Sequence, residues 1–274
     1  MRALSDGFDP DIVARIDDTL DQAIADQHLT IPLAIESGSR AWGFPSPDSD
    51  YDCRFFFVRR FEEVVTLAPP RDVYEHGPPG LLDIGGWEIG KACRLLLKGN
   101  AVVVEWLTSP LIYRGDEMFR SAFLDLARRI GDRNAFARHY LHLGRGQWER
   151  TGGTGGPVNL KKLFYALRPA LALRWMRLHP DQAIVPMHFP TLCSEVDLSQ
   201  PLLDEIDALR AQKAVTREMG EGAVPIGIAG IVSDEFERAE SWTRTVRKPD
   251  PDAAAQANAF YRWALACYSK GWPG

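Results

Sequence analysis

The sequence is poor in cysteine, in long apolar runs and in excess positive charge. Its four cysteines, Cys53, Cys93, Cys193 and Cys267, lie far apart and form no CxxC pair, which argues against a disulfide framework or a zinc site. No stretch approaches the roughly 18 apolar residues of a membrane-spanning helix, and the amino-terminal segment has no apolar signal core. We therefore expect a soluble protein of the reducing cytoplasm that has no membrane partner.

The charge balance limits the kind of partner. The 274 residues carry a formal net charge of −5. Such a chain does not bind nucleic acid over its surface as a whole, because that binding depends on many cations that displace counterions from phosphates. Any anionic ligand must instead meet a local group of basic residues. The hydrophobic content of 45% is ordinary for a globular protein of one large domain or two modest ones.

Two kinds of pattern follow one another along the chain. Before about residue 115, a segment of helical apolar spacing precedes several short extended segments. From there onward the apolar spacing is that of helices. The pattern therefore predicts mixed helices and strands in residues 1–115 and helices in residues 116–274. The apolar segment 101–113 fits a strand or a helix, and the pattern leaves that choice open.

Closely spaced acids begin one of the extended segments. In an extended strand, side chains two residues apart point to the same face, so Asp50 and Asp52 should project together, about 6–7 Å apart at their Cα atoms. Arg54 should share that face. Two carboxylates on a rigid strand suit a hard divalent cation such as Mg²⁺, which a phosphate also coordinates. The cation would relieve the repulsion between the like charges.

A Gly-Ser turn lies upstream of these acids. Gly38-Ser39 is separated from Asp50 by ten residues and follows a predicted strand. Glycine lets the backbone approach a ligand closely, and a serine hydroxyl with backbone N–H groups at a helix start can bind an anion. The turn and the acids together predict a site for a nucleoside triphosphate in which Mg²⁺ bridges carboxylates and phosphates.

This combination resembles the signature of the DNA polymerase β-like nucleotidyltransferases, in which Gly-Ser is followed after a short spacer by Asp-x-Asp on a strand. One branch is especially similar, the bacterial predicted nucleotidyltransferases associated with RNA ligases. The similarity covers most of residues 31–176. It is carried by "GSRAWGFPSPDSDYDCRF", "DIGGWEIGKACRLLLKGN", "EWLTSPLIY" and "KKLFYALRPALALRW".

The resemblance implies an α+β fold, with a mixed β-sheet flanked by helices in a nucleotidyltransferase domain (1–115) and a C-terminal helical domain (116–274) that chooses the acceptor. It implies transfer of a nucleoside monophosphate from a nucleoside triphosphate, with ATP as our choice, to an acceptor hydroxyl, assisted by two Mg²⁺ or Mn²⁺ ions. Asp50 and Asp52 would hold the metals. Gly38 and Ser39 would bind the nucleotide, with Ser39 on the β- or γ-phosphate.

The family usually has a third acid on a neighbouring strand. Asp83 in "LLDIG" is our choice, which gives Asp50, Asp52 and Asp83 as the catalytic and metal-binding set. Glu88 in "WEIG" is the alternative third ligand. An odd offset separates Asp83 from Glu88, so an uninterrupted strand would place them on opposite faces. At most one of the two should meet the metals.

Four further residues are candidates for nucleotide binding. Lys161, Tyr165 and Arg168 lie three and four residues apart on one face of a predicted helix. They form either a solvated basic face or contacts to a triphosphate or RNA across the domain cleft, and the resemblance favours the contacts. Arg40, which follows the Gly-Ser turn, has the same two interpretations.

The segment Gly85–Ala92 nearly matches the P-loop pattern GxxxxGK[ST]. It lacks the final hydroxyl that binds Mg²⁺, and Glu88 would stand among the phosphate-binding amides and repel the ligand. We therefore do not predict a P-loop here.

The acceptor stays open between an RNA end, a protein side chain and a small molecule. The association of similar proteins with RNA ligases favours RNA ends, in repair or processing, with an RNA ligase as partner. The charge of −5 argues against broad, unaided affinity for RNA. Two alternatives are a toxin-like transfer of AMP to a protein and a non-catalytic nucleotide-sensing module of the same fold. The third acid distinguishes an enzyme from a sensing module, because an intact set of three acids favours catalysis and a missing third acid favours sensing.

Overall fold

A mixed five-stranded sheet forms the centre of the computed structural model, which describes residues 1–76, 82–152, 156–217, 219–244 and 250–271. The strand order is β3-β4-β2-β1-β5, with β2 and β4 parallel and the other neighbours antiparallel. The mixed sheet predicted above is confirmed. Its strands are β1 (Thr30–Glu36), β2 (Tyr51–Val58), β3 (Val73–His76), β4 (Leu82–Glu88) and β5 (Ile112–Gly115).

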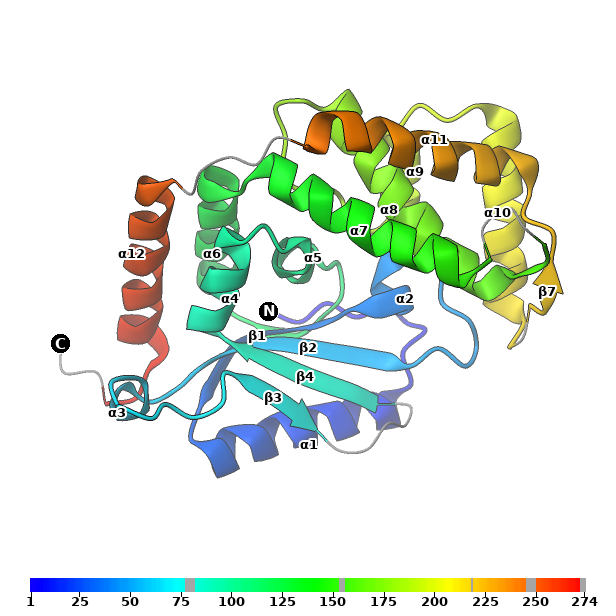
Figure 1. Cartoon of the computed structure of the whole chain (residues 1–274). Coiled ribbons are helices and arrows are strands. Elements are labelled where there is room, and N and C mark those ends of the chain that lie inside the picture. The colour runs from blue at the N-terminus through cyan, green and yellow to red at the C-terminus, as the bar shows by residue number, and fades with distance from the viewer. Residues whose placement is uncertain (77–81, 153–155, 218, 245–249, 272–274) are drawn as a thin grey trace.

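The central strand β2 is buried on both faces, which explains its aromatic sequence. Phe55 and Phe57 pack in a cluster with α1 (Pro10–Gln27) beneath the sheet. Phe56 and Val58 point the other way, into the larger core. Three helices cover that second face, as Figure 1 shows: α4 (Ile89–Leu97), α5 (Ala101–Thr108) and α6 (Glu117–Ile130).

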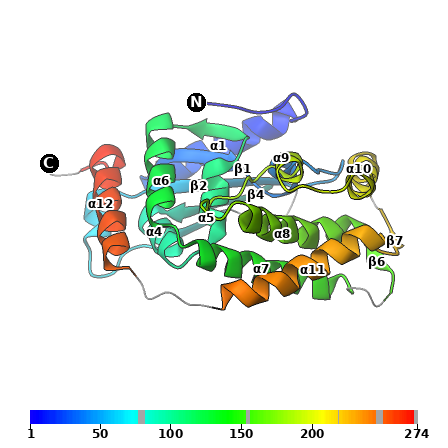
Figure 2. The same ribbon diagram turned by 90° about the horizontal axis from the view of Figure 1, so that it is seen from above.

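The second half of the chain is mostly helical, as predicted. Helices α7, α8 and α11 lie against one another beside the sheet (Figures 1 and 2). The helices not yet given are α2 (Gly38–Trp42), α3 (Phe61–Val64), α7 (Arg133–Arg150), α8 (Leu160–Leu178), α9 (Phe189–Ser194), α10 (Gln200–Val215), α11 (Ile226–Thr243) and α12 (Pro251–Tyr268). A short ribbon pairs β6 (Val158–Asn159) with β7 (Glu221–Gly222).

The last helix returns to the sheet-bearing half of the molecule. α12 packs against α4 and α6, and Phe260 stacks on Phe123 with ring centroids 4.6 Å apart. Figure 1 shows α12 at the side of the sheet opposite to α8 and α10. A division of the chain near residue 115 therefore stays a prediction, since helices from both sides of it share one hydrophobic core.

The ambiguous segment 101–113 contains both kinds of element. Asn100 accepts a hydrogen bond from the backbone N–H of Val102 and so begins α5, which ends before β5 starts. Within the described ranges, no helix combines the length and the apolar character needed to cross a membrane.

Candidate functional site

The turn after β1 brings the Gly-Ser motif against the acidic strand. The N–H of Ser37 donates to the carbonyl of Asp52 at 2.8 Å. Gly38 has a φ of +60°, and a Cβ at this position would lie 2.0 Å from Oδ2 of Asp52. Only glycine combines this backbone conformation with so close a neighbour. Two motifs that are ten residues apart in sequence therefore meet at one place.

Asp52 and Asp83 lie side by side at the start of two parallel strands. They are register partners in the β2–β4 pair, and such strands lie about 4.8 Å apart. The guanidinium of Arg54 contacts both carboxylates: Nη2 lies 3.3 Å from Oδ1 of Asp52 and 2.5 Å from Oδ2 of Asp83. Its Nη1 also donates to Asp83, at 3.0 Å. Arg54 is thus a cation held between two acids.

Asp50 lies one residue before β2, so only Asp52 of the predicted pair is on the strand itself. The side chain of Asp50 is exposed, and its backbone carbonyl accepts a hydrogen bond from Nε of Arg40 at 3.1 Å. The negative charges of Asp83 and Asp50 both raise the pKa of Asp52. All three carboxylates are therefore close enough to interact.

Burial is the main reason why the pKa of Asp52 lies above its ordinary value, and Arg54 acts in the opposite direction. Like charges in a partly buried place are relieved by a cation. The oxygen ligands present here are those that Mg²⁺ or Mn²⁺ takes, so the residues fit a divalent metal. Among the side chains that the structure describes, however, no group of three or more His, Cys, Asp or Glu residues is already arranged as a metal site. Arg54 supplies the positive charge between the two aspartates.

Glu36 holds the backbone of Asp52 in place, and the sequence analysis did not predict this role. Its side chain is fully buried; Oε1 accepts the backbone N–H of Asp52 at 3.0 Å, and Oε2 accepts the hydroxyl of Tyr113 at 2.5 Å. Burial raises the pKa of Glu36 to about 8, against the lowering effect of these two hydrogen bonds. The signal in the sequence was an acid at the end of an apolar strand, two positions before Gly38.

Ser39 and Arg40 hold the loop that leads into β2. The buried hydroxyl of Ser39 donates to Oγ of Ser49 at 2.9 Å. Nη2 of Arg40 donates to the carbonyl of Ser49 at 2.8 Å, and its guanidinium lies 3.9 Å from the centre of the Tyr51 ring. Both side chains are bonded within the protein, and their predicted contacts to a nucleotide stay predictions.

Helix α8 contributes two side chains to the edge of this site. Nζ of Lys161 lies 2.9 Å from both oxygens of Asp48, in the loop before β2. Tyr165 packs edge-on against Trp42, with ring centroids 5.7 Å apart. Burial raises the pKa of Tyr165, and the charges of Asp52 and Asp50 raise it further. Lys161 and Tyr165 therefore face the acidic group from the helical half.

Arg168, the third predicted residue of that helix face, does not reach the acidic group. It is only 2% exposed, and Nη1 donates to Oε1 of Glu105 at 2.8 Å. Its guanidinium lies 4.8 Å from the ring centre of Trp42. The structure thus makes Arg168 part of a buried ion pair between α5 and α8, beneath the site rather than lining it with Lys161.

Lys213 on α10 is a buried cation near the same loop, and sequence reasoning missed it. Its side chain is 1% exposed, and Nζ donates to the carbonyl of Phe44. Burial lowers the pKa of Lys213 to about 8, and the nearby charge of Lys161 lowers it as well. A single lysine within an amphipathic helix gives no sequence signal for such a position.

Glu88, the alternative third ligand, lies at the far end of β4. Glu88 follows Asp83 by five positions, which is about 16 Å along a strand. Its Oε2 accepts the N–H groups of Gly90 at 2.7 Å and Lys91 at 3.2 Å and so begins α4. The structure brings Asp83, and not Glu88, to Asp52. The same bonds occupy the amides of the near-P-loop segment, as its sequence suggested.

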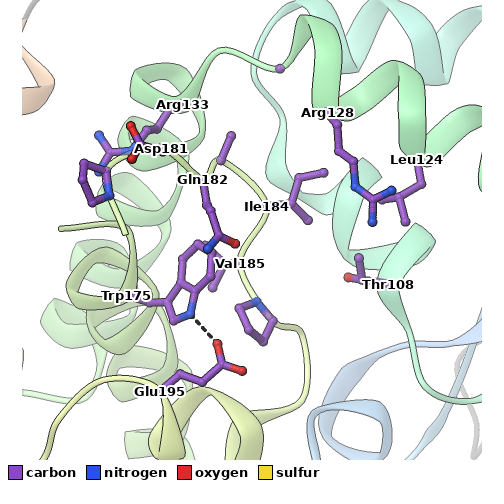
Figure 3. A pocket seen from close by; sticks show the side chains of 14 residues that line it. Thr108, Leu124, Arg128, Arg133, Trp175, Asp181, Gln182, Ile184, Val185 and Glu195 are labelled. Carbon is purple, nitrogen blue, oxygen red and sulfur yellow. Dashed lines mark hydrogen bonds between the residues drawn. The ribbon is translucent and has the colours of Figure 1, made fainter. Parts of the chain in front are cut away.

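A cavity of about 630 Å³ lies apart from these acids (Figure 3). It is formed by α6, α8 and the segment 180–186, and none of the predicted site residues lines it. The indole N–H of Trp175 donates to Oε2 of Glu195 at its wall, at 2.7 Å. We do not assign the active site to this cavity, because the acidic residues that could bind a metal do not line it.

Comparison with known proteins identifies the family. Residues 12–263 match the model of RlaP, described as the RNA repair pathway DNA polymerase beta family. The chain belongs to the RlaP family. The resemblance drawn from Gly38-Ser39 and Asp50-Tyr51-Asp52 is thereby confirmed. RlaP membership links the chain to RNA repair and suggests a nucleotidyltransferase.

A relative of similar length is known from Bacillus subtilis (strain 168). The protein YcgL, described as uncharacterized, is 35% identical over 246 residues. The matched region covers 89% of this chain and 93% of YcgL, so the similarity extends over the sheet and the helical region alike.

Proposed function

We propose that the protein is a Mg²⁺-dependent nucleotidyltransferase that transfers a nucleoside monophosphate, with ATP as our choice of donor, to a hydroxyl at an RNA end. The observation that carries the proposal is the meeting of Asp52 and Asp83 on parallel strands beside Gly38. Membership in a family of the RNA repair pathway supports RNA as the acceptor. The proximity of Asp83 to Asp52 also favours catalysis over nucleotide sensing alone.

Asp52 and Asp83, with Asp50 nearby, are the residues that would hold the metal. A bound divalent cation would neutralise charge on the triphosphate and lower the pKa of the acceptor hydroxyl. The protein positions its own part of the site: Glu36 fixes the backbone of Asp52, and Gly38 leaves room beside its carboxylate. Such positioning is the main contribution a protein makes to phosphoryl-type transfer.

The proposed transfer forms one bond to the α-phosphorus and breaks another. The acceptor oxygen forms a bond to the α-phosphorus, and the bond from that phosphorus to the α–β bridging oxygen breaks, so pyrophosphate leaves. A carboxylate takes up the hydroxyl proton. Asp83 is our choice for this step, because its side chain is 59% exposed whereas that of Asp52 is 24% exposed.

The cationic contacts to the triphosphate are proposed for Lys161 and Arg40. Lys161 is paired with Asp48 and Arg40 with backbone carbonyls, so both would have to exchange these partners for phosphate oxygens. A net charge of −5 supports delivery of the RNA by a basic partner, for which an RNA ligase is our choice.

The test is to incubate the full chain with each α-³²P-labelled nucleoside triphosphate, Mg²⁺ or Mn²⁺, and either RNA with a free 3′-hydroxyl or a mixture of proteins. We expect label from ATP on the RNA. Label on a protein would replace RNA by a protein acceptor. Binding of nucleotide without transfer to either acceptor would contradict the enzyme and favour nucleotide sensing.

A further inference from the structure

A small cavity lies between α7 and α11, away from α1. Figures 1 and 2 both show α7 and α11 side by side, with α1 on the opposite side of the molecule. The cavity has a volume of about 280 Å³, just below the usual range of sites that enclose a whole small molecule. It is lined by Arg138, Leu141, His142 and Arg145 of α7, by Glu240 and Thr243 of α11, and by Arg244, which follows α11 directly.

Helical spacing places the basic side chains of α7 in one row. His142 follows Arg138 by four residues, and Arg145 follows His142 by three, so the three side chains share one face of the helix. Seven residues of helix span about 10 Å. The row therefore extends along the cavity and does not converge on a single point.

Two contacts join this row to α11. Nη1 of Arg138 donates to the carbonyl oxygen of Thr243 at 3.3 Å, where α11 ends. The carbonyl end of a helix carries a partial negative charge, which Arg138 offsets. Arg145 forms an ion pair with Glu240, and the two side chains are 41% and 39% exposed. Because ion pairs this exposed contribute little to stability, Arg145 can exchange Glu240 for a stronger anion at low cost.

An excess of positive charge distinguishes this cavity from larger ones. Its described lining has three arginines, one histidine and one acid. The cavity of Figure 3 has two arginines and two acids in its described lining, and a cavity among α3, α4 and α12 has three of each. A concave surface with an excess of one sign of charge attracts ligands of the opposite sign. The cavity between α7 and α11 is therefore suited to an anion.

The same asymmetry extends over whole helices. α7 contains four arginines and one acid, whereas α1 contains five acids and one arginine. The net charge of −5 thus averages an acidic side and a basic one. The local group of basic residues that an anionic ligand needs in this chain is present on α7. A polyanion would be attracted to α7 and repelled by α1.

The lining favours phosphate groups over a nucleobase. Among the described residues, it offers no aromatic ring apart from the imidazole of His142, so it is poorly suited to stacking on a base. Guanidinium groups bind phosphate oxygens through paired N–H donors. A row of cations about 10 Å long suits the successive phosphates of a strand better than one isolated phosphate. Such contacts position a nucleic acid without reading its sequence.

We propose that the cavity between α7 and α11 binds backbone phosphates of RNA through Arg138, Arg145 and Arg244. The assignment rests on the proposed RNA acceptor and deepens it, because it names a surface that holds the strand outside the acidic group. None of the residues predicted to bind a nucleotide or a metal lines this cavity. Binding there is independent of base identity and of the transfer step.

The test measures the binding of a short single-stranded RNA by fluorescence anisotropy, without nucleoside triphosphate or divalent metal, between about 50 and 200 mM potassium chloride. The logarithm of the affinity falls with the logarithm of the salt concentration, by about 0.7 for each phosphate contact in a single strand. Arg138→Gln, Arg145→Gln and Arg244→Gln should each make this slope shallower by about 0.7, and the triple variant by about 2. Arg15→Gln, which changes an exposed arginine of α1, is the control and should leave the slope unchanged.

Glu240→Gln should act in the opposite direction. It removes the acid of the lining and releases Arg145, so RNA should bind more tightly, by up to about fivefold. A purely structural role of the ion pair predicts no such gain, and thermal unfolding checks that every variant folds. The proposal is overturned by a wild-type salt slope in the folded triple variant, by weaker RNA binding in Glu240→Gln, or by no RNA binding to the wild type at about 50 mM salt.

ATP in the same metal-free buffer distinguishes a strand from a free nucleotide. Displacement of the RNA by ATP at an equal concentration of phosphate groups would assign the cavity to a small phosphorylated molecule and overturn the assignment to RNA. The proposed transfer can fail separately. RNA binding whose salt slope becomes shallower in the triple variant, without any labelling of the RNA, supports the cavity and contradicts the transfer; labelling of the RNA with an unchanged slope in that variant does the reverse.

Discussion

The two ends of the β2–β4 pair differ although the same strands in the same register form both. At the first end Asp52 and Asp83 are partly exposed, and Arg54 is bonded to both of them. At the other end Glu88 and Arg59 are more than nine-tenths buried and leave polar atoms without partners. The first end has an excess of like charge and is suited to a cation with a phosphate. The second is balanced in charge, with three arginines and three acids around it.

The difference follows from what covers each end. The acidic end meets the short helix α2, the loop before β2 and the edge of α8, and the side chain of Asp83 there remains 59% exposed to solvent. The other end lies among α3, α4 and α12, and burial there raises the pKa of Glu88. The shared strands thus connect a charged, partly exposed end with a buried polar end about 16 Å away.

Asp52→Asn tests the acidic end with the largest effect. The amide keeps the shape of the side chain but removes a charged metal ligand, so nucleotidyl transfer should fall by more than about 100-fold. The matched control is Asp18→Asn, because Asp18 is exposed on α1 beneath the sheet. Label incorporation from α-labelled ATP is the measurement, and equal rates in the two variants would show that Asp52 has no part in the reaction.

Gly38→Ala tests the contact between the turn and the strand. A Cβ would both require a strained φ of +60° and collide with Asp52, so we expect a loss of unfolding free energy of about 2–4 kcal/mol. Gly220→Ala is the control: its φ is +69°, but nothing lies within 4 Å of the added Cβ. It should lose only about 1 kcal/mol in urea denaturation. Equal losses would show that the turn does not press on Asp52.

Arg54→Gln tests the internal cation. Without its charge, Asp52 and Asp83 repel each other, and the free energy of unfolding should fall by about 1 kcal/mol in the absence of metal, given the partial exposure of the pair. The affinity for Mn²⁺, measured by electron paramagnetic resonance, should rise because the competing guanidinium is gone. Weaker Mn²⁺ binding would mean that Arg54 assembles the metal site instead of competing for it.

Glu88→Ala gives the smallest expected effect and acts on the other end. It removes the acceptor for the amides of Gly90 and Lys91, a loss of about 1 kcal/mol for a helix of this kind. Glu88→Gln should keep most of that stability, since its amide oxygen can accept the same N–H groups. Thermal unfolding of the two variants checks this, and a Gln variant as unstable as the Ala variant would contradict a capping role.

Local spacing was enough to predict the parts of the site that lie close in sequence. The Gly38-Ser39 turn and the acids that follow it were recognised because their spacing resembles the Gly-Ser and Asp-x-Asp signature of the polymerase β-like family. The sheet followed from the aromatic residues of β2, which are buried on both faces. The segment 101–113 could not be assigned, because an apolar run has no period that separates a strand from a buried helix.

Contacts between distant residues could not be predicted in this way. Arg54 was expected on the face of Asp52, but its bonds to Asp83 depend on the pairing of β2 with β4. Arg168 shares a helical face with Lys161 in sequence, yet it is buried against Glu105, and spacing alone does not distinguish a buried ion pair from a solvated one. The buried position of Glu36 depends on Tyr113, which follows it by 77 residues.

The most direct test of the central claim is a Mn²⁺ titration followed by electron paramagnetic resonance, in the presence of a non-hydrolysable ATP analogue. The wild type is compared with Asp52→Asn combined with Asp83→Asn, with folding checked by thermal unfolding. The account predicts that the wild type binds Mn²⁺ at least about tenfold more tightly, because the two aspartates hold the metal that carries the triphosphate. Equal affinity in a folded double variant would contradict it.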